Sequence, residues 1–171
     1  GMGWLEHLDM LDWLSLLIEK EPDAEIVMHG ISMGSATTMI TTGSPQLPTN
    51  VKVAIADCGY STVTKEFTHQ LKDLFGLPPF PLLPVTSLVT KLRAKYFFSQ
   101  VDCVSAVVQS KTPTLFVHGD ADDFVPFTML EEVYQAAACP KEKLVVIGAG
   151  HADSREVAPE LYWETVDSFI S

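Results

Sequence analysis

The sequence predicts an α/β fold, a parallel sheet with helices on both faces, and two observations support this. Short apolar segments alternate along the chain with longer segments of helical periodicity, and the apolar run at 52–60 lacks the polar alternation of a half-exposed strand. Repeated strand–helix units connected in the right-handed sense make their strands parallel. Because the 171 residues are 47% apolar and 19% charged, we expect residues 1–171 to form a single domain with its own core.

The first part of the chain contains two helical patterns and two strand patterns. Residues 1–18 place apolar side chains at helical spacing, and Pro22 ends that element. A strand is expected at 24–30, because the run AEIVMHG is apolar and stops at a glycine. A helix from 33–41 follows and ends in a turn rich in Gly and Pro, and the apolar run 52–60 predicts the second strand.

The last part of the chain repeats this unit twice. The apolar runs at 112–120 and 143–151 predict two more strands. Helical patterns at 128–138 and 158–170 follow them, so each strand precedes a helix. The expected sheet therefore has four strands.

The segment 61–108 interrupts this alternation. It holds two helical stretches around LFGLPPFPLLP and no strand, and it is too apolar for a solvated linker. We interpret it as a helical cap or lid inserted over one edge of the sheet. An ordinary pair of surface helices joined by a stiff turn explains the same pattern equally well.

Charge and cysteine content exclude several classes of protein. A net charge of −11 repels nucleic acid and anionic membrane surfaces, so neither is expected as a partner. Acidic residues interrupt the first apolar stretch and no basic region precedes it, which argues against a signal peptide or membrane anchor. Three widely spaced cysteines without zinc-ligand spacing favour reduced thiols and a cytoplasmic location. No metal is expected, because the acidic loop at 120–126 and His118 lack a ligand set at helical or loop spacing, and no cofactor is expected, because no phosphate-binding glycine loop appears.

The stretch IVMHGISMGSAT at 26–37 contains the pattern G-x-S-x-G between a predicted strand and a predicted helix. In such a turn Ser32 is lifted clear of the sheet, and we expect Gly30 and Gly34 to relieve clashes with neighbouring backbone. The N–H of Met33 then lies at a helix N-terminus, where it can donate to an oxyanion. A tight turn with a structural serine is the alternative reading.

A serine nucleophile needs a base, and the chain offers five histidines. His151 is the candidate, because it follows a glycine-rich loop at the carboxyl edge of the sheet, where Ser32 also lies. His7 and His69 fall in helical patterns, where surface or packing roles are expected. His29 should point away from Ser32, and His118 ends a strand.

An orienting carboxylate is expected in the loop HGDADDFVP, which also follows a strand. Asp120, Asp122 and Asp123 are the candidates, although three acidic residues could simply form a solvated turn. The order Ser, Asp, His along the chain is that of the α/β-hydrolases.

With HGISMG at 29–34, PTLFVHGDADDFVP at 113–126 and GAGH at 148–151, nearly the whole chain resembles the C-terminal part of an α/β-hydrolase. The resemblance is to serine carboxylesterases and to lysophospholipase-like and dipeptidyl-peptidase-like hydrolases. It implies that Asp122 is the acid and that Asp120 and Asp123 are loop and hydrogen-bonding residues. It also puts segment 61–108 at the position of the family's cap.

The chain departs from this family before the serine turn. A full α/β-hydrolase has several earlier strands and a loop that supplies a second oxyanion donor, and neither is found upstream of Ser32. We therefore expect a fragment, a truncated product or one part of a split or oligomeric assembly. The strand at 24–30 is then an exposed apolar edge, which predicts a homodimer or higher oligomer.

The leading functional hypothesis is a serine hydrolase acting on a small-molecule carboxylic ester through Ser32, Asp122 and His151, with the Met33 N–H holding the oxyanion. Thioesters and amides would use the same groups. Apolar residues of the cap segment suggest an acyl or aromatic substrate group or, for most of them, packing: Phe75, Leu77, Phe80, Leu82 and Leu83. The alternative is a catalytically impaired hydrolase-like module that acts through oligomerisation.

Overall fold

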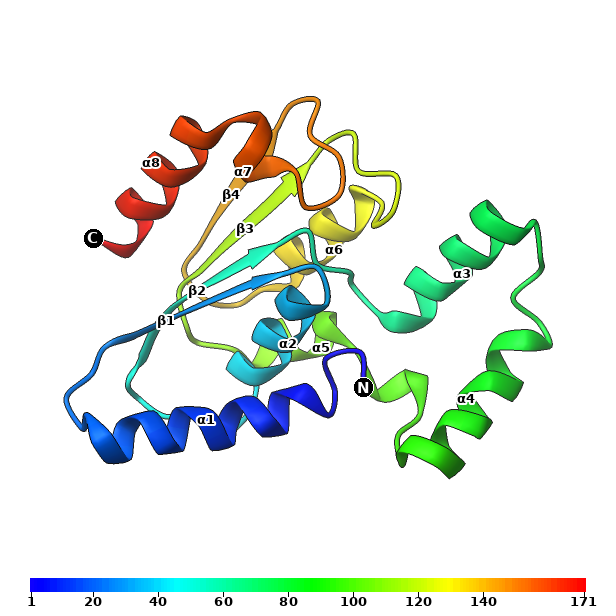
Figure 1. Ribbon diagram of the computed structural model, residues 1–171, viewed down its shortest axis with the longest axis horizontal. Coiled ribbons are helices and arrows are strands. Elements are labelled where there is room, and N and C mark those ends of the chain that lie inside the picture. Colours follow the sequence, from blue (N-terminus) through cyan, green and yellow to red (C-terminus); the bar gives the residue numbers. More distant parts are fainter.

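Four parallel strands form one sheet in the structure, a computed structural model that describes residues 1–171 (Figure 1). The strands are β1 (Ile26–Ile31), β2 (Val51–Asp57), β3 (Thr114–Gly119) and β4 (Lys141–Val146). They lie in the order β1-β2-β3-β4, and each neighbouring pair is parallel. The predicted α/β fold is confirmed, and β1 and β4 are the two edge strands.

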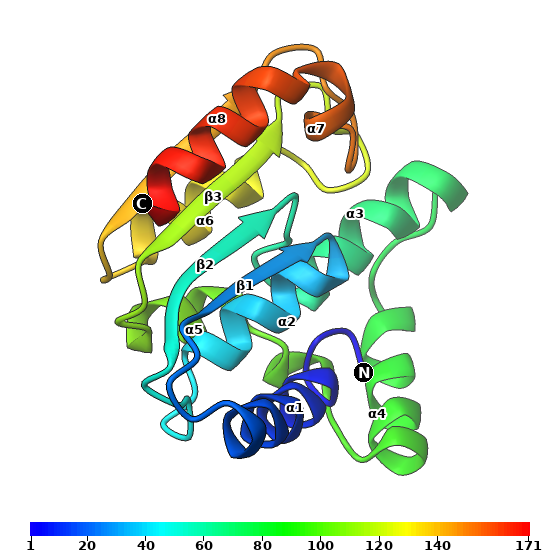
Figure 2. The ribbon, with the colours of Figure 1, turned by 60° about the vertical axis from the view of Figure 1, so that its left-hand side comes forward.

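Helices lie on both faces of this sheet (Figures 1 and 2). One face is covered by α2, α5 and α6, and α1 packs beside α2, whereas α8 lies on the opposite face. The helices are α1 (Glu6–Lys20), α2 (Met33–Thr42), α3 (Val63–Phe75), α4 (Leu82–Ala94), α5 (Cys103–Gln109), α6 (Thr128–Ala136), α7 (Ser154–Val157) and α8 (Pro159–Ile170), with a short 3₁₀ helix, η1 (Phe98–Gln100).

Alternating side chains of each strand divide the core into two layers. Because successive strand residues point to opposite faces, Phe116 of β3 packs on the α2 side while Leu115 and Val117 pack on the α8 side. The α2-side layer contains 19 buried residues, and the α8-side layer contains eight, among them Tyr162. The sheet is therefore buried most deeply along β3, whose six residues are all buried.

Helix α1 is amphipathic and packs its apolar face against the beginning of the sheet. Leu11 and Leu14 are buried with Met28 of β1, while Trp13 on the other side of the helix is exposed. No helix of the structure has both the length and the apolar character needed to cross a bilayer.

Two of the predicted strands run at least three residues past the carboxyl ends of the observed ones. The second was expected over 52–60, but pairing stops at Asp57 because Cys58 has a positive φ of 45° that breaks the extended backbone. The fourth was expected to reach residue 151, but β4 ends at Val146 and Gly148 turns the chain with a φ of 78°. Both breaks occur at the carboxyl edge of the sheet, where the chain forms loops.

Segment 61–108 contains α3, α4, η1 and α5. Helices α3 and α4 project from the body of the molecule, and an isolated antiparallel bridge between Thr62 and Asp102 closes the base of this projection (Figure 1). The bridge is extended by a hydrogen bond from the Cys103 N–H to the Ser61 carbonyl. Beyond it, α5 packs against α2 and α6, so this last helix belongs to the layer that covers the sheet.

Candidate active site

Ser32 is the single residue between β1 and α2. Its backbone is strained, with φ 55° and ψ −118°, and its N–H donates to the Asp57 carbonyl at 2.9 Å. A Cβ on Gly30 would lie 2.1 Å from the Gly34 carbonyl oxygen, so no larger residue fits there. A Cβ on Gly34 would meet nothing within 4 Å, so the expectation that both glycines relieve a clash is wrong for Gly34.

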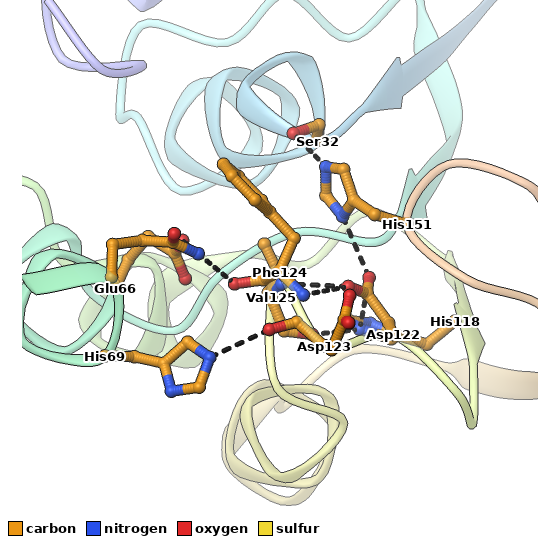
Figure 3. A network of polar contacts seen from close by, with 10 residues as sticks. Ser32, Glu66, His69, His118, Asp122, Asp123, Phe124, Val125 and His151 are labelled. Atoms are coloured by element: carbon orange, nitrogen blue, oxygen red, sulfur yellow. Dashed lines mark hydrogen bonds and ion pairs between the residues drawn. The ribbon is translucent and has the colours of Figure 1, made fainter. Parts of the chain in front are cut away.

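The structure brings Ser32, His151 and Asp122 together from three loops at the carboxyl edge of the sheet (Figure 3). The Nε2 atom of His151 lies 2.8 Å from the Ser32 hydroxyl oxygen. On the other side of the ring, Nδ1 lies 2.9 Å from an Asp122 carboxylate oxygen. The imidazole therefore bridges the serine and the carboxylate.

Asp122 is held from several directions in the loop after β3. One carboxylate oxygen accepts hydrogen bonds from the N–H groups of Phe124 and Val125, at 3.0 and 2.8 Å. The other faces His151 and lies 3.2 Å from Nε2 of His118, a fully buried histidine. Burial alone would raise the pKa of Asp122, but hydrogen bonds from His118, His151 and Val125 lower it well below its usual range. Asp122 is therefore ionised at neutral pH.

An ionised Asp122 determines the protonation pattern of the His151 ring. A carboxylate can only accept, so Nδ1 carries the proton and donates to Asp122, which leaves the lone pair of Nε2 facing Ser32. The hydrogen bond to Asp122 raises the pKa of His151 against the opposing effect of burial. This arrangement allows the ring to accept a proton from the serine and then to hold it.

The other acidic and histidine candidates occupy different positions. Asp120 accepts a hydrogen bond from the Gly148 N–H at 2.6 Å and joins the loops after β3 and β4. His69 reaches the same region, because its Nε2 lies 2.8 Å from the Asp123 carbonyl. His29 points to the α8 side and lies 2.8 Å from the Tyr162 hydroxyl, and His7 is buried near the N-terminus.

Side chains of helix α3 hold the acidic loop, residues 120–126 after β3, through hydrogen bonds. The Gln70 side-chain amide donates to the Phe124 carbonyl at 2.6 Å and to the carboxylate of Glu66 at 3.1 Å. Glu66 is buried beside the site, and burial raises the pKa of its carboxyl group. Sequence reasoning missed these contacts and that of His118, because helical and strand periodicity do not show how α3 is oriented against the loop.

An apolar groove of about 450 Å³ adjoins this contact between α3 and the acidic loop. It runs between α3 and α4, and Gln70 forms part of its wall. Its apolar lining comes from both helices and their connection: Phe67, Leu71, Phe75, Leu77, Leu82 and Leu83. The groove offers an apolar surface next to the loop that carries Asp122.

Sequence comparisons match most of this chain. The model of the prolyl oligopeptidase family matches residues 6–156. The Bacillus subtilis protein YqkD, itself uncharacterised, is 28% identical over 169 residues, which cover 98% of this chain and 55% of that protein. The chain spans about half the length of the curated relatives it matches.

Solved structures share the fold at lower sequence identity. An esterase from Pyrococcus furiosus superposes with a TM-score of 0.75 at 20% identity, covering 99% of this chain and 62% of that one. An acylaminoacyl peptidase in complex with Z-Gly-Gly-Phe-chloromethyl ketone superposes with a TM-score of 0.68 at 18% identity, covering 97% of this chain and 28% of the peptidase. In both cases the likeness extends over almost all of this chain.

Proposed function

Because the chain belongs to the prolyl oligopeptidase family, within the α/β-hydrolase superfamily, we propose that it is a serine hydrolase that cleaves carboxylic esters with Ser32 as nucleophile. The observation that carries the proposal is the 2.8 Å contact between the Ser32 hydroxyl and Nε2 of His151. A serine hydroxyl becomes nucleophilic when a positioned base accepts its proton, and this contact has the length of a hydrogen bond.

The reaction proceeds in two halves. Ser32 Oγ attacks the ester carbonyl carbon while His151 Nε2 takes the hydroxyl proton, and Asp122 stabilises the imidazolium. The N–H of Met33, the first residue of α2, donates to the oxyanion. Collapse of the intermediate expels the alcohol, which receives the proton from His151. Water then attacks the acyl-enzyme by the same route and releases the acid and free Ser32.

An ester with an apolar acyl or aromatic group fits the surroundings of the site. The groove between α3 and α4 is mostly apolar and shares Gln70 with the loop that positions Asp122. We therefore propose that residues 61–108 act as a cap that contributes the apolar part of the substrate site. Thioesters and amides would be attacked by the same serine, and the amide bond is the hardest of the three to cleave.

Labelling with a fluorophosphonate tests the nucleophile directly. We expect one adduct on the purified chain, mapped to Ser32 by peptide mass spectrometry, and its loss in Ser32→Ala and His151→Ala. Matched controls are Ser44→Ala and His29→Ala, which remove a serine and a histidine outside the contact of Ser32 with His151 and should keep the adduct.

The outcome separates the two functional hypotheses. Labelling that depends on both Ser32 and His151 supports a working nucleophile and justifies a screen of esters that differ in acyl chain length. A folded sample that takes up no label contradicts the proposal and favours a catalytically impaired module.

A further inference from the structure

Cys58 lies close to both His151 and Asp122. It follows the last residue of β2, has a positive φ of 45° and is completely buried. Its Sγ, a carboxylate oxygen of Asp122 and a ring nitrogen of His151 all lie within 4.8 Å of one another. The three side chains come from the loops after β2, β3 and β4, so no spacing in the sequence indicates that they meet.

We propose that Cys58, Asp122 and His151 form a binding site for a thiophilic divalent cation, Zn²⁺, and that the bound metal inhibits the hydrolase. The inhibitory part rests on the proposed function, whereas metal binding does not. Thiolate, imidazole and carboxylate are the three side-chain ligands that zinc prefers, and a water molecule would complete a tetrahedral site. Neighbouring donors on tetrahedral zinc are separated by about 3.6 Å, so the cluster needs only small side-chain shifts to close around a metal.

The inhibition follows from the way metal binding moves the protons of Cys58 and His151. Before binding, Cys58 is a buried free thiol, and Nδ1 of His151 carries the ring proton. Zinc takes the sulfur as thiolate, and the thiol proton leaves to solvent. Nδ1 faces Asp122, so the metal takes its lone pair and the ring proton moves to Nε2. Nε2 then donates to Ser32 and can no longer accept its proton, and no oxidation or reduction is involved.

The other two cysteines provide controls within the same chain. Cys103 Sγ faces the Ala36 carbonyl at 4.0 Å, and Cys139 Sγ faces the Thr114 hydroxyl at 3.7 Å. Both are buried and free, like Cys58, but these partners are neutral. Among the three thiols, Cys58 alone lies in a cluster with a histidine and a carboxylate.

The proposed site is largely shielded from solvent. The Asp122 side chain is completely buried, whereas 22% of the His151 side chain is exposed. A cation therefore reaches the sulfur past the imidazole ring, which must move to admit it. We expect binding with a slow onset that a chelator reverses.

Binding is tested with Cd²⁺, because zinc has no spectrum and a cadmium–thiolate bond absorbs in the ultraviolet. Cd²⁺ added to the full chain should produce this absorption band, and EDTA should remove it. We expect the band to be absent in Cys58→Ser and retained in Cys139→Ser. Asp122→Asn keeps the thiol and should weaken cadmium binding at least 10-fold. Replacing even a residue that only hydrogen-bonds to a metal ligand typically lowers metal affinity about 10–100-fold.

Inhibition is tested with Zn²⁺ on fluorophosphonate labelling, each variant being compared with its own metal-free rate. Cys58→Ser should need at least about 10-fold more zinc for half inhibition, whereas Cys139→Ser should behave as the wild type.

No cadmium band in the folded wild type, or a band that persists in folded Cys58→Ser, overturns the proposal. If circular dichroism shows that Cys58→Ser is unfolded, undiminished cadmium binding by Asp122→Asn overturns it instead. A cadmium band that depends on Cys58, in a chain that takes no label without metal, supports the site and contradicts the proposed hydrolase.

Discussion

The phenyl ring of Phe124 lies against the imidazole of His151, with ring centroids 4.8 Å apart and planes inclined by 44°. Phe124 also donates its N–H to Asp122, and its carbonyl accepts from Gln70 of α3. One turn of chain therefore supplies the carboxylate that binds His151 and a ring that packs against it. The position of the base depends on this turn and, through Gln70, on α3.

Replacing Phe124 by alanine should loosen the imidazole without removing any group that exchanges protons. An aromatic contact is worth about 0.5–1.5 kcal/mol, so we expect kcat/KM for an ester such as p-nitrophenyl acetate to fall about 2- to 10-fold. Trp13→Ala is the control, because Trp13 is 62% exposed on α1 and belongs to neither the proposed site nor the cap segment. Equal rates for Phe124→Ala and the wild type would show that the ring does not position the base.

The ionisation of His151 should follow its hydrogen bond to Asp122. Because that bond raises the pKa, NMR titration in the presence of EDTA should place it above the ordinary value of 6.5, and kcat/KM should rise with pH as the ring loses its proton. Asp122→Asn removes the charge, so the pKa should fall, and loss of the correct tautomer should lower kcat about 10⁴-fold. An unchanged His151 pKa in Asp122→Asn would contradict the hydrogen bond seen here.

The two glycines of the serine turn should respond in opposite ways to the same substitution. In Gly30→Ala the new Cβ would meet the Gly34 carbonyl at 2.1 Å, and we expect a loss of about 1–3 kcal/mol or more in the free energy of unfolding. In Gly34→Ala the Cβ meets nothing within 4 Å, and alanine favours the helix by up to about 1 kcal/mol. Urea unfolding of both variants measures the difference, and similar stabilities would argue against the turn described here.

Pairing of two chains through the 24–30 edge stays a prediction. β1 is an edge strand and Val27 on it is 43% exposed, so its free backbone groups can join another strand. Light scattering after gel filtration should give at least twice the chain mass, and Val27→Lys should shift the protein towards monomer. Val85→Lys, on the exposed face of α4, serves as the control. A wild-type monomer at all concentrations would rule the pairing out.

The parts of the fold that sequence reasoning predicted are those that depend on local patterns. Ser32 lies in a recognisable turn, and His151 follows a strand, so both were expected at the carboxyl edge. Parallel strands bring their carboxyl ends to one edge of the sheet, which is why residues far apart in sequence could be expected to meet.

The contacts that were missed depend on packing between distant elements. His118 contacts Asp122, and Gln70 of α3 contacts the acidic loop. The sequence around each of these two residues looks the same as it would if the residue had only a structural role. The cluster of Cys58 with Asp122 and His151 arises because the loops after β2, β3 and β4 all leave the sheet at its carboxyl edge. The end of the second strand was also predicted too late, because nothing in its apolar sequence indicates the positive φ at Cys58.

The bridge between Thr62 and Asp102 has a consequence for how such a protein can diversify. Since α3, α4 and η1 leave and rejoin the sheet layers at one point, their sequence and length can change without altering the register of any strand. The register of the four strands is thereby independent of the length of the projecting helices. Exchanging residues 63–101 for the equivalent segment of a relative would therefore replace the apolar groove, and it would keep the chemistry only where the new α3 also supplies the contact that Gln70 makes with the Phe124 carbonyl.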